Sequence, residues 1–179
     1  AARWLAEQGT GHLVLTSRRE PDEAVRQRIE HAEQEHGCQI HVMLADVSQP
    51  DEVGHLLRTI ESELPPLRGV FHAAGVLDDG VLAEQSWERF QRVLAPKVLG
   101  AWHLHHQTRH LPLDFFVLYS SVASEVGSAG QSNYAAANAF LDGLAWQRQS
   151  QGLAATSVNW GPWAEGGMAS SHTARTRMA

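Results

Sequence analysis

The sequence has 179 residues, of which 43% are hydrophobic and 19% are charged, and its net charge is −6, a composition typical of a globular protein with one sizeable core. The negative charge argues against a nucleic-acid partner, and no apolar run reaches the roughly 18 residues of a membrane span. The single cysteine, Cys38, forms no internal disulfide and is typical of a reducing compartment, so we expect a cytoplasmic protein.

Hydrophobic periodicity predicts strands and helices that alternate along the chain. In chain order, we expect a helix at 1–8, a strand at 12–17, a helix at 22–36, a strand at 39–46, a helix at 51–64, a strand at 68–75, a helix at roughly 86–106, a strand at 114–121, a helix at 132–149 and a strand at 154–161. This alternation predicts an α/β fold with a Rossmann-like, doubly wound parallel sheet that helices cover on both faces.

The first predicted strand takes the second place in such a sheet. In the strand order 3-2-1-4-5-6, a glycine-rich loop follows strand 1, whereas a helix precedes the first visible strand here. We therefore expect strand 1 and the glycine-rich loop to lie upstream, so that residues 1–179 are one domain truncated at both ends. Because strand 1 is central, its neighbours would have unpaired edges, and we expect the isolated chain to be unstable or rearranged.

The ends of the predicted strands have residues suited to a dinucleotide. The first strand ends in Ser17 and is followed by Arg18, where an NAD enzyme has an acidic residue. Since guanidinium matches phosphate oxygens, this end favours the 2′-phosphate of NADPH. Asp46 and Val47 are expected to border the adenine, and the small residues 73–75 bring bare backbone close to a flat ligand. The alternative for both groups is an ordinary solvated turn.

Polar residues at other strand and helix ends have the pattern of proton-transfer catalysis. Ser120 or Ser121 projects from the carboxyl edge of the sheet, where ligands bind in this fold class. Tyr134 and Asn138 share one helix face, and Lys97 lies on the apolar stripe of the preceding helix. An ammonium beside Tyr134 would favour the phenolate and make the tyrosine a general acid. The alternative is that Lys97 lays its stem along the core and ends in water.

These residues occur in segments that resemble the ketoreductase domains of modular polyketide synthases, within the short-chain dehydrogenase/reductase superfamily. The resemblance covers nearly the whole chain and rests on "LVLTSRR", "PPLRGVFHAAGVLDDG", "LAPKVLGAWHLH", "DFFVLYSSVAS", "GQSNYAAANAFLDGLA" and "TSVNWGPWAEGGMA". Most of the superfamily has a lysine four residues after the tyrosine. These ketoreductases resemble a version of that site in which asparagine takes this position and the preceding helix supplies the lysine. Asn138 stands in that place here, and Lys97 lies on the preceding helix.

The resemblance implies NADPH-dependent reduction of a β-ketoacyl thioester, carried on the phosphopantetheine of an acyl carrier protein, beside neighbouring synthase domains. Tyr134 would give a proton to the carbonyl oxygen, and Ser121 would hydrogen bond to that oxygen and orient it. Lys97 would assist the tyrosine and bind the nicotinamide ribose, while Asn138 would support the lysine and a proton-relay water. The residues expected to bind the cofactor, the last two beside the nicotinamide, are Ser17, Arg18, Asp46, Val47, Ala73, Ala74, Gly75, Lys97, Tyr134, Gly161 and Pro162.

The segment "LDD", Leu77, Asp78 and Asp79, resembles the fingerprint of the B-type ketoreductases, which implies the D-configured, usually 3R, alcohol. Val126 agrees with this type, because the A-type has a tryptophan eight residues before the tyrosine. Ala136 stands two residues after the tyrosine in place of proline, which suggests an unepimerised or absent α-methyl group. The alternative is an acidic turn whose aspartates cap the next helix.

Other functions fit the sequence less well. His103 and His106 could share a helix face, but no acidic or cysteine partner is near in sequence, so we expect no metal site. A general short-chain dehydrogenase acting on free alcohols would have lysine at position 138 and no "LDD". A catalytically silent scaffold domain of a megasynthase is the remaining alternative, although such a domain need not keep the serine, tyrosine and lysine. The chain stops soon after "GGMAS", where the family's substrate lid begins.

Overall fold

The computed structural model describes residues 1–162, and the segment 163–179, which contains "GGMAS", lies outside the described residues. The chain forms two compact units. Among the described residues, one comprises Ala1–Asp46 and Pro50–Leu67, and the other comprises Val47–Gln49 and residues 68–162.

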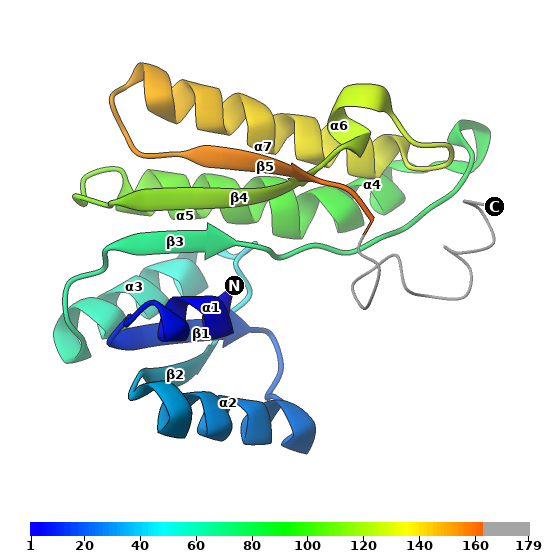
Figure 1. Cartoon of the computed structure of the whole chain (residues 1–179). Coiled ribbons are helices and arrows are strands. Elements are labelled where there is room, and N and C mark those ends of the chain that lie inside the picture. Colours follow the sequence, from blue (N-terminus) through cyan, green and yellow to red (C-terminus); the bar gives the residue numbers. More distant parts are fainter. Residues whose placement is uncertain (163–179) are drawn as a thin grey trace. The chain divides into compact units, whose positions relative to one another are not determined.

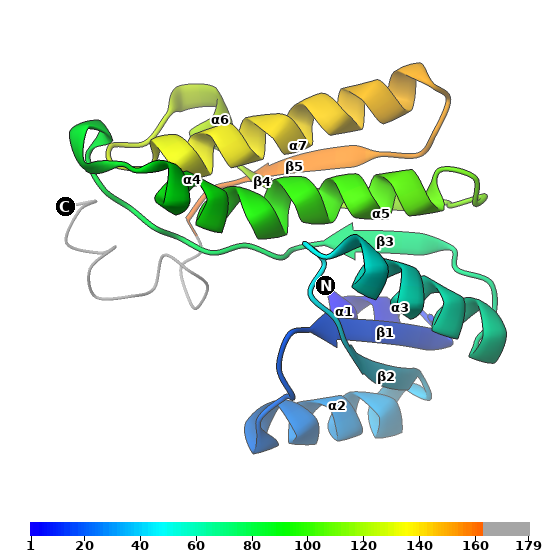
Figure 2. The ribbon, with the colours of Figure 1, turned by 180° about the vertical axis from the view of Figure 1, so that it is seen from behind.

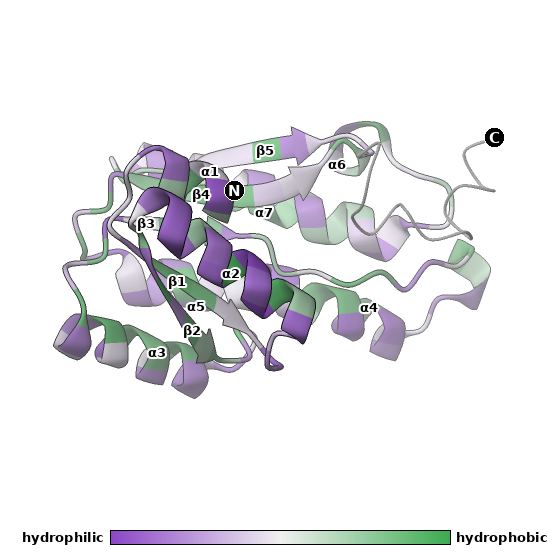
Figure 3. Ribbon diagram, turned by 60° about the horizontal axis from the view of Figure 1, so that its bottom comes forward, coloured by the Kyte–Doolittle hydropathy of each residue, from purple (hydrophilic) through white to green (hydrophobic). Residues whose placement is uncertain are grey.

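The first unit is a two-stranded parallel sheet with helices on both faces. Its elements are α1 (Ala2–Glu7), β1 (His12–Ser17), α2 (Glu23–His36), β2 (Gln39–Leu44) and α3 (Pro50–Glu63). Along α3, hydrophobic and hydrophilic residues alternate (Figure 3), and Leu56 and Ile60 pack against Val14 and Met43 on one face of the strands. The helix α2 ends at Gly37, whose φ of 66° is the left-handed cap that the sequence predicts.

The second unit is a three-stranded parallel sheet in the order β3-β4-β5. Its elements are β3 (Gly69–His72), the 3₁₀ helix η1 (Leu82–Glu84), α4 (Trp87–Leu94), η2 (Ala95–Leu99), α5 (Gly100–Thr108), β4 (Phe115–Ser121), α6 (Ala123–Val126), α7 (Ser132–Ser150) and β5 (Thr156–Trp160). Figures 1 and 2 show α5 and α7 side by side on one face of this sheet. Phe116, Leu118 and Ser120 of β4 are buried, since alternate residues of a strand face the same side.

The prediction of a parallel α/β fold is confirmed, and the strands form two separate sheets. β1 and β3 are each the end strand of their sheet. In the order 3-2-1-4-5-6, β2 and β1 take places 3 and 2, while β3, β4 and β5 take places 4, 5 and 6. No strand among residues 1–162 takes place 1.

The long helix expected at roughly 86–106 is interrupted by a π-helical segment. This segment, η2, separates α4 from α5 and contains Pro96. A proline has no N–H to donate to the carbonyl four residues before it, and its ring clashes with that carbonyl. A wider π turn relieves this conflict, and such turns occur frequently at functional sites. Lys97 is the central residue of the π segment.

Candidate active site

Lys97 is the cation that the sequence predicts beside Tyr134. The residue is 3% exposed, and its Nζ lies 5.4 Å from the centroid of the Tyr134 ring. The ammonium donates a hydrogen bond to Tyr119 O at 2.8 Å, so that Lys97 joins β4 to the start of α7. The alternative in which Lys97 ends in water is therefore wrong.

The surroundings of Lys97 control its charge and its backbone. Burial lowers the pKa of the Lys97 ammonium to about 8, and the negative charge of Asp142 opposes this shift. Burial, followed by the charge of Lys97, lowers the pKa of His72 to about 4, so His72 is neutral near neutral pH. Its Nε2–H donates to Lys97 O at 3.2 Å, because a carbonyl oxygen accepts only from a protonated nitrogen. His72 thus holds the π segment at the lysine itself.

The two serines at the end of β4 face opposite sides of the strand. Ser120 is buried, and its hydroxyl donates to Asn138 O at 3.2 Å. Ser121 is partly exposed, and its Oγ accepts a hydrogen bond from Ala123 N at 3.2 Å. An oxygen that accepts this bond still has its own O–H to donate to another group. The geometry therefore favours Ser121 over Ser120 as the serine that meets a ligand.

Asn138 is fully buried one turn after Tyr134. Its Nδ2 donates to Tyr134 O at 2.8 Å, whereas its Oδ1 receives no hydrogen bond from the part of the chain that the structure describes. Buried amide oxygens normally have a donor, so this atom is suited to accept a hydrogen bond from a water or a ligand group. No hydrogen bond between Asn138 and Lys97 occurs among the described residues, and that support stays a prediction.

Asp142 is a carboxylate that the sequence analysis did not single out. It accepts hydrogen bonds from Ser124 Oγ at 2.6 Å, from Asn159 Nδ2 at 3.1 Å and from Ser157 Oγ. Ser124 Oγ also lies 2.8 Å from Ser121 O, and Asn159 Nδ2 donates to Ser124 Oγ at 2.7 Å. This network holds the turn that follows Ser121 against α7 and β5.

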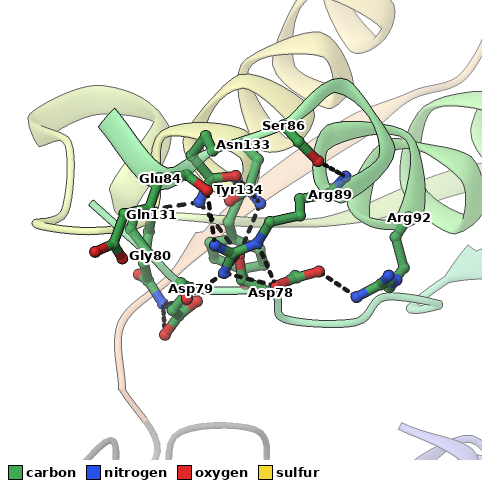
Figure 4. Close-up of polar contacts among 11 residues, drawn as sticks. Asp78, Asp79, Gly80, Glu84, Ser86, Arg89, Arg92, Gln131, Asn133 and Tyr134 are labelled. Carbon is green, nitrogen blue, oxygen red and sulfur yellow. Dashed lines mark hydrogen bonds and ion pairs between the residues drawn. The ribbon is translucent and has the colours of Figure 1, made fainter. Parts of the chain in front are cut away.

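The acidic residues of "LDD" lie in the loop after β3 and contact α4 and the segment before α7 (Figure 4). Arg89 Nε donates to Asp78 Oδ1 at 2.8 Å. Gln131 Nε2 lies 3.1 Å from both carboxylate oxygens of Asp79 and donates to them. The alternative in which these aspartates cap the next helix is wrong, because the N-cap of α4 is Ser86.

The remaining expected residues of the second unit lie in loops at the carboxyl ends of its strands. Residues 73–75 follow β3, and a Cβ on Gly75 would lie 3.0 Å from Lys97 Cε, so the glycine allows the lysine to pass close to the backbone. Leu77 is half-buried in the same loop. Residues 161–162 follow β5 and are exposed.

The expected cofactor residues are divided between the two units. In the first unit, Arg18 Nη1 lies 3.9 Å from Asp46 Oδ2, and the Arg18 side chain is 63% exposed. Ser17 Oγ donates to Arg19 O, and both residues line a pocket of about 370 Å³ beside β1. Val47 belongs to the second unit.

The sequence predicted neither a metal site at the histidines nor a helix that crosses a membrane. His103 Nδ1 lies 3.2 Å from Val47 O, and His105 Nδ1 lies 3.0 Å from Arg148 Nη1. The described residues contain no group of three His, Cys, Asp or Glu side chains placed to hold a metal ion. No helix within residues 1–162 has the length and the apolar surface needed to cross a bilayer.

Comparisons with known proteins agree on one family. The family model of the KR domain matches residues 1–165. Polyketide synthase GfsB of Streptomyces halstedii is 48% identical over 99% of this chain and 3% of its own length. A relative from Mycobacterium tuberculosis, the phenolphthiocerol synthesis polyketide synthase type I Pks1, is 44% identical over 96% of this chain and 11% of its own length, and its name includes the word "inactive".

A solved structure described as A-type ketoreductases from a modular polyketide synthase is 43% identical to this chain, with a TM-score of 0.91. The match covers 99% of this chain and 37% of that one. The chain thus spans a small part of each curated relative and 37% of the solved ketoreductase.

Proposed function

The chain belongs to the KR domain family, the ketoreductase domains of modular polyketide synthases, and from this premise we propose that it is the catalytic part of an NADPH-dependent β-ketoacyl reductase. The substrate would be a β-ketoacyl thioester on the phosphopantetheine of an acyl carrier protein, and the product the β-hydroxyacyl thioester. Residues 1–179 would be one piece of a longer domain in a cytoplasmic megasynthase, beside other synthase domains.

The polar groups of the chain fit NADPH. An ammonium has three N–H groups, and Lys97 donates one of them to Tyr119 O, which leaves two for the hydroxyls of the nicotinamide ribose. The exposed guanidinium of Arg18 and the nearby Ser17 suit a 2′-phosphate. Residues 73–75 and 161–162 offer small side chains and open backbone for a flat ring. When bound, NADPH would supply the hydride that reduces the ketone.

The protein would supply the proton and orient the carbonyl. Tyr134 would donate its phenolic proton to the carbonyl oxygen, and the buried ammonium of Lys97 would stabilise the phenolate that remains. Ser121, whose O–H is not used by its bond from Ala123 N, would donate a hydrogen bond to the same oxygen. A water that donates a hydrogen bond to Asn138 Oδ1 would return a proton to the tyrosine. This water would give the buried Oδ1 the donor that it lacks among the described residues.

The stereochemical proposal rests on the loop after β3. Leu77, Asp78 and Asp79 resemble the B-type fingerprint, and Val126 stands where the A-type has tryptophan. We therefore expect the D-configured, usually 3R, alcohol. Ala136 favours a substrate with an unepimerised or absent α-methyl group. A predominantly L-configured product would contradict this part of the proposal.

The observation that carries the proposed function is the Lys97 ammonium 5.4 Å from the Tyr134 ring centroid, in a buried site. The test uses the parent domain, meaning this chain within the polypeptide that supplies the strand and glycine-rich loop expected upstream. NADPH oxidation is measured with a β-ketoacyl thioester, with NADH in parallel and chiral analysis of the product. We expect turnover with NADPH, much slower turnover with NADH, and D-alcohol.

The alternative is a catalytically silent scaffold domain. The name of the mycobacterial relative, which includes the word "inactive", is the reason to test it. A folded parent domain that binds NADPH but gives no turnover with any β-ketoacyl thioester would favour the scaffold. Turnover that needs Tyr134 would exclude it.

A further inference from the structure

The carboxylate of Asp78 forms ion pairs with two arginines of the same chain. Its side chain is 13% exposed, and Oδ1 lies 2.8 Å from both Nε and Nη2 of Arg89. Arg92 Nη1 donates to the other oxygen, Oδ2. Two guanidinium groups therefore contact one carboxylate (Figure 4), and little of it is left to meet a substrate.

Arg89 also encloses the backbone of the loop. Its Nη2 donates to Asp79 O at 2.6 Å, and its Nη1 donates to Glu84 O at 3.1 Å. All three guanidinium nitrogens are therefore engaged. The guanidinium lies so close to Gly80 that a Cβ there would be 2.6 Å from Nη1. The glycine that follows "LDD" thus makes room for the arginine.

The loop held by Arg89 is hydrogen bonded to the segment that contains Tyr134. Asn133 is fully buried, and its Nδ2 donates to Asp78 O at 2.9 Å. Its Oδ1 accepts a hydrogen bond from Tyr134 N at 2.7 Å. Gly80 N donates to Gly130 O at 2.8 Å, which adds a backbone bond between the same two segments. One side chain, that of Asn133, therefore links the loop carbonyl to the amide of the tyrosine.

We propose that Arg89 is a positioning residue for stereocontrol, which fixes the "LDD" loop through Asp78 and the loop carbonyls and couples it through Asn133 to Tyr134. This inference rests on the proposed function, because it concerns the face of the ketone presented to the tyrosine. The aspartates act by shaping the loop, and the loop shape limits how the acyl chain approaches. A displacement of about 1 Å in a positioned group is enough to change reaction rates substantially.

Arg92 provides the matched control. It contacts the same carboxylate as Arg89, but its side chain is 64% exposed, and its one described hydrogen bond goes to the Asp78 carboxylate and none goes to the loop backbone. Arg89→Met and Arg92→Met remove the same charge from the same aspartate. A difference between the two variants therefore reports the bonds of Arg89 to the loop and excludes an effect of net charge.

The experiment compares both variants in the parent domain by two measurements. The first is the ratio of D to L alcohol from a β-ketoacyl thioester. The second is amide hydrogen exchange at Gly80 and Tyr134, which needs no turnover. For Arg89→Met we expect the D:L ratio to fall about tenfold and exchange at these amides to accelerate about tenfold. The reason is that the clamp, meaning Arg89 with its bonds to the Asp78 carboxylate and to the carbonyls of Asp79 and Glu84, opens locally. Arg92→Met should change both by less than about twofold, since exposed ion pairs contribute little.

Equal effects of the two arginine variants, or unchanged exchange and unchanged D:L ratio in Arg89→Met, would overturn the proposal. Failure of the wild-type domain to reduce any thioester would overturn the proposed function instead, while hydrogen exchange would still decide whether the clamp exists. If Arg89→Met does not fold, Gly80→Ala, which displaces the guanidinium and keeps its charge, takes its place in both measurements.

Discussion

The two neighbouring serines of β4 give a sharp prediction because they differ in one respect, the side of the strand that they face. Ser121→Ala removes the hydroxyl proposed to donate to the developing oxyanion. Loss of one such donor lowers kcat by about 10²–10³-fold, or roughly 3–4 kcal/mol. Ser120→Ala removes a buried hydroxyl that donates to Asn138 O at 3.2 Å. That carbonyl lies within α7 and keeps its intrahelical bond, so the loss is about 1 kcal/mol of folding stability.

The assay is steady-state NADPH oxidation by the parent domain, with thermal unfolding measured on the same samples. We expect Ser121→Ala to lose activity with an unchanged Tm, and Ser120→Ala to unfold about 3 °C lower while kcat stays within about threefold. The reasoning is refuted if Ser120→Ala loses as much kcat as Ser121→Ala, or if Ser121→Ala keeps wild-type kcat.

Three further predictions concern charge. The pKa of the Lys97 ammonium is about 8, and Asp142 favours its charged form. We therefore expect kcat/KM to fall as pH rises through about 8, and we expect Asp142→Asn to move this fall to lower pH. A flat profile up to about pH 10 would contradict the proposed role of Lys97. Arg18→Ala should raise the KM for NADPH by roughly ten- to a hundredfold and leave the KM for NADH unchanged, measured by initial rates with each nucleotide, since the arginine is proposed to bind only the 2′-phosphate. Arg148→Met should destabilise the domain by about 3 kcal/mol in urea unfolding, because it leaves His105 Nδ1 and a backbone carbonyl without their buried donor; a loss below about 1 kcal/mol would show that this arginine is dispensable.

Much of the fold followed from local signals. Apolar strands ended by polar residues gave β1 at 12–17 without error, and Gly37 gave the end of α2. Lys97 was found because a charged residue on an apolar stripe needs a partner, and the structure gives it Tyr119 O and the Tyr134 ring. The division into two sheets agrees with the expectation that none of the predicted strands takes place 1.

The clamp around "LDD" could not be read from the sequence, because its partners are far apart along the chain. Asn133 and Asp78 are separated by 55 residues, and Arg89 and Asp78 by 11. Asp78 lies in a loop, so no helical or strand period relates it to Arg89 or Asn133. The π segment at Lys97 was also missed, although Pro96 inside an expected helix was a visible signal. Asp142 follows Tyr134 by eight residues on the same helix, a spacing that places both near one face.

The measurement that tests the central claim most directly is Tyr134→Phe in the parent domain. NADPH binding is followed by fluorescence titration and β-ketoacyl reduction by NADPH oxidation. If Tyr134 is the general acid, the Kd for NADPH stays within about threefold of wild type while kcat falls by at least about a hundredfold. A phenylalanine variant that binds NADPH and still turns over within about threefold of wild type would contradict the account.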